Sequence, residues 1–344
     1  MNIAVLCGGI SAERDVSITS GTKVALALRE RGHNVVLIDV FFGYLGSYTD
    51  PIEIFGRNEP IEERTVAETE PDLETIRASR TQANNSLIGD NVIEICRAAD
   101  ITFLALHGDV GENGKLQAAF DVMDVRYTGS GYLGSALAMN KSVSKALFEN
   151  AGIKTPASIT IFKGETPYRN IGFPCVVKPC SGGSSVGTSI VTTENEYLTA
   201  LELAFKYEEG VLVEQYIKGR ELTVGILGGE AMPVIEIIPK QGFFDYKNKY
   251  QDGMTEEICP AEIGEEMTKA VQALTERTHS ALMIDCYSRV DFIMYESGEL
   301  YVLEANTLPG MTPTSLVPRM AKNIGMDYGV LCEKIIEISL EKYK

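Results

Sequence analysis

One segment, residues 288–306, constrains the fold of this chain more than any other part of it. Two strand-like runs flank the dipeptide Ser297-Gly298, whose composition is typical of a tight turn. A two-residue turn at this dipeptide pairs Glu296 with Glu299 across two antiparallel strands. The sequence therefore predicts a hairpin in the C-terminal part of the chain.

The register of this hairpin groups four polar side chains. Counting back from the turn places Asp291 opposite Glu304. Arg289 then falls opposite Asn306, and the two-residue period of a strand puts all four side chains on one face. Two carboxylates and an amide oxygen that face inward repel unless a cation lies between them, and hard oxygen ligands favour Mg²⁺ with phosphate oxygens beside it. The alternative is a surface ladder of ion pairs, because the alternation does not say which face is buried.

A second polar cluster follows the strand-like run Val176-Val177. Lys178 ends this run, and the glycine- and serine-rich stretch 180–187 comes next. Successive backbone N–H groups in such a turn form a nest for an anion, and the lysine adds a positive charge for phosphate. A flexible surface hairpin is the alternative. The segment is not a Walker P-loop, because no GxxxxGK[ST] occurs and the strand-like stretch 188–192 follows instead of a helix.

The first forty residues predict a βαβ unit, the start of a parallel sheet. A strand-like run over 3–6, a Gly8-Gly9 turn, a helical stretch over 17–31 and a second strand-like run over 35–38 follow one another. Ligands of parallel sheets gather where strands end, and Glu13 lies just beyond the first strand. An exposed acid at a helix entry is the alternative for this residue.

The parallel-sheet domain is expected to extend to about residue 128. A helix over 90–98, capped by Asp90, leads into an apolar strand over 101–106 that ends at His107. This histidine lies at the same sheet edge as the residues after the first strand, and its role stays open.

The rest of the chain predicts α+β structure. A helix is expected over 140–150. Glycine-rich turns then separate short strand-like runs, which favour antiparallel pairs over a continued parallel sheet. The expected pairs are 174–179 with 188–193, and 211–215 with 222–227 and 233–238.

Charge and cysteine content narrow the classes of partner and location. With 48 acidic against 31 basic residues the net charge is −17, which repels nucleic acid and anionic membranes, so neither is expected as a partner. We expect neither a signal peptide nor a membrane span, because no basic leader precedes the first strand and no run of 18 apolar residues occurs. Seven cysteines without close pairing favour free thiols in the cytoplasm. The acidic, weakly periodic stretch 42–85 is expected to be a solvated excursion.

Two further patterns carry less weight. Gly129–Gly134 fits G-x-G-x-x-G, but the preceding residues 125–127 are too short and polar for a central strand, so a nicotinamide cofactor is not expected. The three histidines are far apart and no CxxC occurs, so zinc is not expected.

Together, six motifs resemble the D-alanine–D-alanine ligase family of the ATP-grasp fold, in the family's order and over nearly the whole chain. They are Gly8–Ser17, His107-Gly108 with Gly111–Gly114, Lys178-Pro179 with Gly183–Gly187, Phe244–Tyr250, Arg289–Asp291 and Glu304–Thr312. The resemblance implies an α/β domain over residues 1–128, followed by two α+β domains over 129–212 and 213–344 that clamp ATP. Asp109-Val110 and Leu308 depart from the family's pattern.

The resemblance also implies three groups of site residues. Those implied to bind ATP are Lys141, Lys178, Glu214, Glu221 and Lys249. The implied ligands of two Mg²⁺ ions, which Mn²⁺ could replace, are Asp291, Glu304 and Asn306. Those implied to bind or act on two D-alanine molecules are Glu13, Ser184, Tyr250, Arg289, Gly310, Ser315 and Leu316.

The implied reaction explains these residue types. A carboxylate is a poor electrophile, so ATP phosphorylates the first D-alanine and the amine of the second attacks the acyl phosphate. Arg289 and the Gly310 amide would stabilise the oxyanion that forms. Lys249 lies in the stretch 242–253, implied to be a lid that excludes water. The product, D-alanyl-D-alanine, is a peptidoglycan precursor.

Two alternative functions stay open beside a D-alanine–D-alanine ligase. A ligase that joins D-alanine to D-serine or D-lactate is the alternative enzyme, although Tyr250 and Leu316 favour D-alanine as the acceptor. A nucleotide-binding regulatory module is the non-enzymatic alternative. A homodimer is expected.

Overall fold

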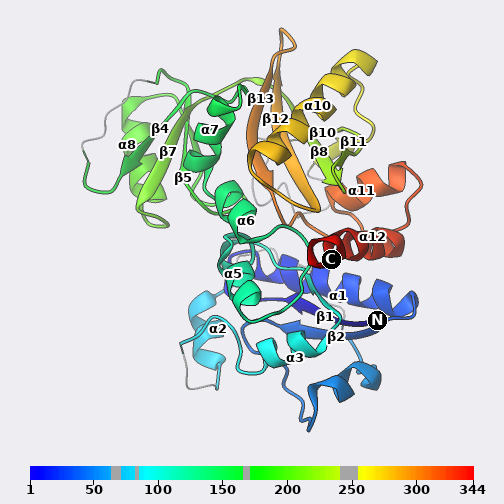
Figure 1. Ribbon diagram of the computed structural model, residues 1–344. Coiled ribbons are helices and arrows are strands. Elements are labelled where there is room, and N and C mark those ends of the chain that lie inside the picture. The colour runs from blue at the N-terminus through cyan, green and yellow to red at the C-terminus, as the bar shows by residue number, and fades with distance from the viewer. Residues whose placement is uncertain (63–70, 82–84, 166–170, 241–254) are drawn as a thin grey trace.

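The computed structural model describes residues 1–62, 71–81, 85–165, 171–240 and 255–344. Three sheets organise them, a parallel sheet near the N-terminus and two antiparallel sheets that follow in the chain (Figure 1). None of the described helices is both long and apolar enough to cross a membrane. All seven cysteines are free thiols, as predicted.

The N-terminal sheet has three parallel strands in the order β2-β1-β3. Its strands are β1 (Asn2–Cys7), β2 (Asn34–Asp39) and β3 (Ile101–Leu104), and the first helix is α1 (Arg14–Glu30). Residues 3–6 of β1 are fully buried, because a central parallel strand is covered on both faces. The predicted βαβ unit and the third strand are confirmed. That strand ends two residues before its predicted end, so Ala105 and Leu106 lie in the loop that carries His107.

Two details of this domain differ from the predictions. Asp90 does not cap α3 (Val92–Ala98); Asn91 stands at that position, and its side chain bonds Tyr44 rather than the helix. The excursion 42–85 contributes to the core, because Ile54 and Phe55 of the short 3₁₀ helix η1 (Pro51–Arg57) are buried there. By contrast, α2 (Leu73–Ser79) buries no residue.

The second sheet has four antiparallel strands in the order β4-β7-β5-β6. They are β4 (Ser158–Phe162), β5 (Cys175–Pro179), β6 (Ser189–Val191) and β7 (Gly210–Gln215), with α8 (Glu194–Ala204) packed on β5 and β6. The predicted pairing of 174–179 with 188–193 is confirmed. The boundary expected between residues 212 and 213 falls inside β7 and stays a prediction.

The third sheet is also antiparallel, in the order β11-β10-β8-β12-β13. Its strands are β8 (Gly219–Leu227), β9 (Glu230–Ala231), which pairs with β8, β10 (Ile235–Pro239), β11 (Thr255–Ile258), β12 (Tyr287–Tyr295) and β13 (Leu300–Asn306). The predicted pairing of 222–227 with 233–238 is confirmed. The pairing of 211–215 with 222–227 is wrong, because β7 belongs to the second sheet and residues 216–218 carry the chain from one sheet to the other.

The remaining helices cover the sheets and connect them. They are α4 (Asp109–Glu112), α5 (Lys115–Val122), α6 (Tyr132–Met139), α7 (Lys141–Asn150), α10 (Glu265–Ala281), α11 (Leu316–Asn323), α12 (Tyr328–Leu340) and the short 3₁₀ helix η2 (Glu341–Tyr343). The helix predicted over 140–150 is α7, and the Asn140 side chain caps it by accepting from the Val143 N–H at 3.1 Å. Helix α12 packs on α1, so the C-terminal helix returns to the N-terminal domain (Figure 1).

The β12–β13 hairpin has the predicted register at the polar residues but not the predicted turn. Tyr295, rather than Glu296, pairs with Glu299, because Gly298 adopts a positive φ in a three-residue turn. The register then shifts back by one residue between Asp291 and Phe292, which leaves Leu303 as a bulge in β13. The two departures cancel, and Asp291 pairs with Glu304 as predicted.

Candidate active site

A pocket lies between the two antiparallel sheets. It contains about 1020 Å³ of space not filled by atoms, part of it open to solvent. On one side it is lined by α7, β5, β7 and the glycine-rich loop 181–188. On the other side it is lined by β8, β12 and β13. Six of the predicted nucleotide and metal residues line it: Lys141, Lys178, Glu214, Glu221, Asp291 and Glu304.

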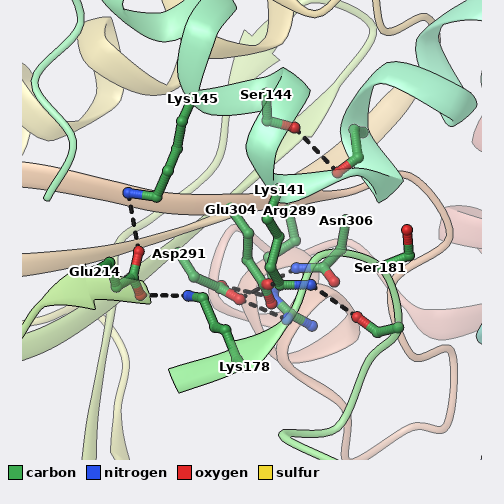
Figure 2. Close-up of polar contacts among 12 residues, drawn as sticks. Lys141, Ser144, Lys145, Lys178, Ser181, Glu214, Arg289, Asp291, Glu304 and Asn306 are labelled. Atoms are coloured by element: carbon green, nitrogen blue, oxygen red, sulfur yellow. Dashed lines mark hydrogen bonds and ion pairs between the residues drawn. The ribbon is translucent and has the colours of Figure 1, made fainter. Parts of the chain in front are cut away.

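Two lysines flank one carboxylate on the β7 side of this pocket. Glu214 forms an ion pair with Lys178 of β5 and a second one with Lys145 of α7, at 2.9 Å (Figure 2). Burial alone would raise the pKa of Glu214, but the positive charges of Lys178 and Lys145 outweigh it and lower the pKa below its usual value. Glu214 is therefore ionised at neutral pH.

Lys141 connects the glycine-rich loop to the hairpin. Its Nζ donates to the carbonyl oxygen of Gly182 at 2.7 Å and lies 3.2 Å from a carboxylate oxygen of Glu304. Burial would lower the pKa of Lys141, but the attraction of Glu304 raises it overall. A fixed cation thus lies beside the loop whose backbone N–H groups favour an anion.

The predicted metal residues meet on one face of the hairpin. Asp291 accepts hydrogen bonds from Nε and Nη2 of Arg289 at 2.9 and 2.8 Å, and from Nδ2 of Asn306 at 3.1 Å (Figure 2). The Thr223 hydroxyl also donates to Asp291, at 2.6 Å. Together with Glu304 these residues present carboxylate and amide oxygens, a donor set that fits Mg²⁺. Among the described residues no three His, Cys, Asp or Glu side chains form a metal-binding group, so phosphate or water oxygens would have to complete the coordination.

A contact from the N-terminal domain closes one end of the glycine-rich loop. The Ser184 hydroxyl donates to the Glu13 carboxylate, and both side chains are buried. Ser184 and Ser185 adopt positive φ angles, a conformation uncommon for residues with a Cβ and frequent at functional sites. A Cβ at Gly183 would lie 2.6 Å from a Glu13 oxygen, so a larger residue there would displace the Glu13 carboxylate from this position. Tyr250, predicted to join this set, and Lys249, predicted to reach the γ-phosphate from the stretch 242–253, lie outside the described residues.

The loop after β13 carries the remaining predicted residues. Ser315 precedes α11, and its Oγ accepts from the Thr312 N–H at 3.1 Å. A Cβ at Gly310 would lie 2.9 Å from the same oxygen, so the loop backbone approaches Ser315 closely. Leu316 begins α11 and is buried.

The sequence interpretation missed Glu112, which holds this loop against the N-terminal domain. Its carboxylate accepts from the Gly108 N–H at 2.6 Å and from the Leu308 N–H at 3.4 Å. His107 also contacts Leu308, because its Nδ1 lies 3.0 Å from the Leu308 carbonyl oxygen. Burial and the nearby charge of Glu13 raise the pKa of Glu112 to about 8, whereas burial lowers the pKa of His107. The motif around 107–114 was the only signal of this role in the sequence.

Two antiparallel sheets that enclose a pocket of lysines and carboxylates define this chain as an ATP-grasp protein. Two family profiles match it, "D-ala D-ala ligase N-terminus" over residues 2–130 and "D-ala D-ala ligase C-terminus" over residues 147–337. The chain belongs to the D-alanine–D-alanine ligase family.

Individual relatives are similar to this chain over nearly its full length. A D-alanine--D-alanine ligase from Pediococcus pentosaceus is 43% identical, over 98% of this chain and 97% of the relative. A crystal structure of the enzyme of that name from Bacillus anthracis, complexed with ATP, has a TM-score of 0.76 and 32% identity, with 99% of this chain and 97% of that one covered. The VanG D-Ala:D-Ser ligase from Enterococcus faecalis has a TM-score of 0.75 and 30% identity, with 98% of each chain covered. The chain is therefore a ligase of this family.

Proposed function

We propose that this protein uses ATP to join two D-alanine molecules into D-alanyl-D-alanine through an acyl phosphate, a step in peptidoglycan precursor synthesis. The observation that carries the proposal is that Glu13, a candidate amino-acid ligand, lies next to the candidate phosphate site. The Glu13–Ser184 hydrogen bond attaches a carboxylate of the N-terminal domain to the loop that borders the pocket of Lys141 and Lys178. An amino acid held at Glu13 would lie beside a nucleotide phosphate.

The nucleotide would bind between the two antiparallel sheets. Lys141 and Lys178 would hold its phosphates as cations close to the backbone of the glycine-rich loop. Glu214 and Glu221 would accept hydrogen bonds from adenine and ribose, and Lys249 would reach the γ-phosphate. Mg²⁺, bound by Asp291, Glu304 and Asn306 in two positions that Mn²⁺ could also occupy, would neutralise charge on the phosphates.

The two amino acids would bind where the three domains meet. Glu13 would pair with the ammonium group of the first D-alanine, and Ser184 and Tyr250 would orient the second. Arg289 and the Gly310 N–H would stabilise the oxyanion formed when the second amine attacks. Ser315 would contact the carboxylate of the second D-alanine, and the buried Leu316 its methyl group.

The apolar contact at Leu316 supports D-alanine as the acceptor. A hydroxymethyl group placed against it would lack a hydrogen-bond partner, which costs on the order of 1–3 kcal/mol. D-Serine and D-lactate remain the alternative acceptors. We also infer a cytoplasmic enzyme that acts as a homodimer and is divided into the three domains 1–128, 129–212 and 213–344.

Product identification tests the proposal directly. Purified protein would be incubated with ATP, Mg²⁺ and equal concentrations of D-alanine, D-serine and D-lactate, and the products identified by mass. We expect D-alanyl-D-alanine as the main product, with ADP and phosphate. A main product that contains D-serine or D-lactate would overturn the acceptor assignment, and the absence of ATP-dependent condensation would overturn the proposed function.

A further inference from the structure

Lys145 is a buried lysine to which the proposed reaction assigns no role. It follows Lys141 by about one turn of α7, and its side chain is only 3% exposed. Its Nζ donates to Thr155 Oγ1 at 2.7 Å and to the Pro156 carbonyl oxygen at 2.8 Å. The third neighbour is Glu214, with a carboxylate oxygen at 2.9 Å. Burying an ammonium group is costly unless an opposite charge compensates it, so Glu214 is the partner that allows Lys145 to be buried.

Glu214 thus has two counter-ions in different places. Lys178 lines the pocket and approaches one carboxylate oxygen, whereas Lys145 approaches the other oxygen and does not line the pocket (Figure 2). Two ammonium groups for one carboxylate leave a net positive charge at this position. A nucleotide phosphate can therefore attract Lys178 while Lys145 stays with Glu214.

Contacts to both antiparallel sheets hold Lys145 in place. Thr155, which accepts from Lys145, donates to the Val302 carbonyl oxygen of β13 at 2.8 Å. The Val302 N–H donates to the Lys154 carbonyl oxygen at 2.9 Å, so residues 154 and 155 are joined to the third sheet. Glu214 belongs to the second sheet. Lys145 is anchored where the two sheets meet and cannot follow Lys178 toward a ligand.

We propose that Lys145 is a positioning residue, the permanent counter-ion of Glu214, which lets Lys178 exchange from this carboxylate to a nucleotide phosphate while Glu214 stays ionised. The inference rests on the proposed use of ATP. Without Lys145, the departure of Lys178 would leave a buried carboxylate uncompensated, and this cost would oppose nucleotide binding.

The exchange also has a consequence for base selection. An ionised carboxylate accepts a hydrogen bond from the exocyclic amine of adenine, but it repels the carbonyl oxygen that hypoxanthine carries at the same position. Keeping Glu214 ionised in the complex therefore favours ATP over ITP. Loss of the charge on Glu214 should weaken this preference.

Steady-state kinetics of four proteins test the exchange: wild type, Lys145→Gln, Glu214→Gln and the double variant. Glutamine keeps a donor for Thr155 or Pro156 but removes the charge. We expect Lys145→Gln to raise the KM for ATP roughly tenfold or more, with kcat and the KM for D-alanine within about twofold of wild type. In the Glu214→Gln background the same change should alter the KM for ATP by less than about twofold, because no carboxylate then needs a counter-ion. The preference for ATP over ITP should fall in both variants that carry Glu214→Gln.

Lys154→Met is the matched control, because Lys154 is half-exposed and pairs with Glu299 away from the pocket. Thermal unfolding separates misfolding from weak binding. If Lys145→Gln alone does not fold, a rise in the KM for ATP from Glu214→Gln to the double variant would still overturn the inference, and these two proteins can be compared because neutralising both buried partners is tolerated better than removing one. An unchanged KM for ATP in Lys145→Gln, or an equal rise in both backgrounds, would overturn the inference. A wild type without ATP-dependent turnover would instead overturn the proposed function.

Discussion

The carboxylate of Glu13 and the hydroxyl of Ser184 form a buried hydrogen bond although 171 positions separate them in the chain. It joins the loop after β1 to the glycine-rich loop after β5. The proposed amino-acid site and the proposed phosphate site are therefore neighbours only in the folded protein.

Neutralising either carboxylate of the hairpin should abolish turnover and leave the fold intact. Asp291→Asn and Glu304→Gln each remove a charge from the proposed Mg²⁺ site, at a cost of several kcal/mol in the transition state or at least about a hundredfold in kcat. Glu299→Gln, on the exposed end of the same hairpin, is the control and should retain wild-type kcat. Near-wild-type turnover in either site variant would rule out the metal assignment.

Removing the charge of Lys178 should weaken nucleotide binding without unfolding the protein. Lys178→Ala deletes a cation of the pocket, and we expect the Kd for ATP, measured by calorimetry, to rise roughly tenfold or more. Lys206→Ala changes an exposed lysine just after α8 and should leave the Kd unchanged. Equal affinities in the Lys178 variant and wild type would favour the alternative, in which the loop is a surface hairpin that does not bind phosphate.

Arg289→Ala should lower kcat much more than it raises the KM for ATP. The guanidinium would act on an oxyanion that exists only after the second amine attacks, so its loss should appear mainly in the chemical step. Single-turnover and steady-state rates would measure this. A change confined to KM would assign Arg289 to binding and to holding Asp291 instead.

Glu112 should make stability depend on pH. Its pKa of about 8 in the folded protein lies above the ordinary value of 4.5, so between these values the folded state binds more protons than the unfolded state. The contribution of Glu112 to the free energy of unfolding is therefore complete below pH 4.5 and is lost as the pH rises toward 8, by up to about 1.4 kcal/mol per pH unit. Urea unfolding between about pH 5.5 and 8 should show that the free energy of unfolding falls less per pH unit for Glu112→Gln than for wild type. Equal slopes would contradict the raised pKa.

Leu316→Arg should increase incorporation of D-serine relative to D-alanine. The arginine replaces a buried apolar contact with a hydrogen-bond donor, which gives the hydroxymethyl group a partner. Competition between the two acceptors at equal concentration, with products resolved by mass, measures the ratio. An unchanged ratio at retained activity would show that Leu316 does not contact the acceptor side chain.

Strand periodicity and turn composition were enough to predict the parts of the site that lie on one local element. The face shared by Arg289, Asp291, Glu304 and Asn306 follows from strand periodicity, and the turn error did not matter because the bulge at Leu303 restored the register. The position of Lys178 at the end of β5 likewise follows from a buried strand that runs into a glycine-rich turn.

Which of these elements contact one another depends on the packing of the whole chain. The strand β7 pairs with β4 and β5 rather than with β8. This pairing places Glu214 beside Lys178 and Lys145. The contact of Glu112 with Leu308 depends in the same way on how distant segments pack. Strand periodicity and turn composition act over a few residues, whereas the pairing of sheets and the burial of charge depend on the energy of the whole packed chain, which no local pattern contains.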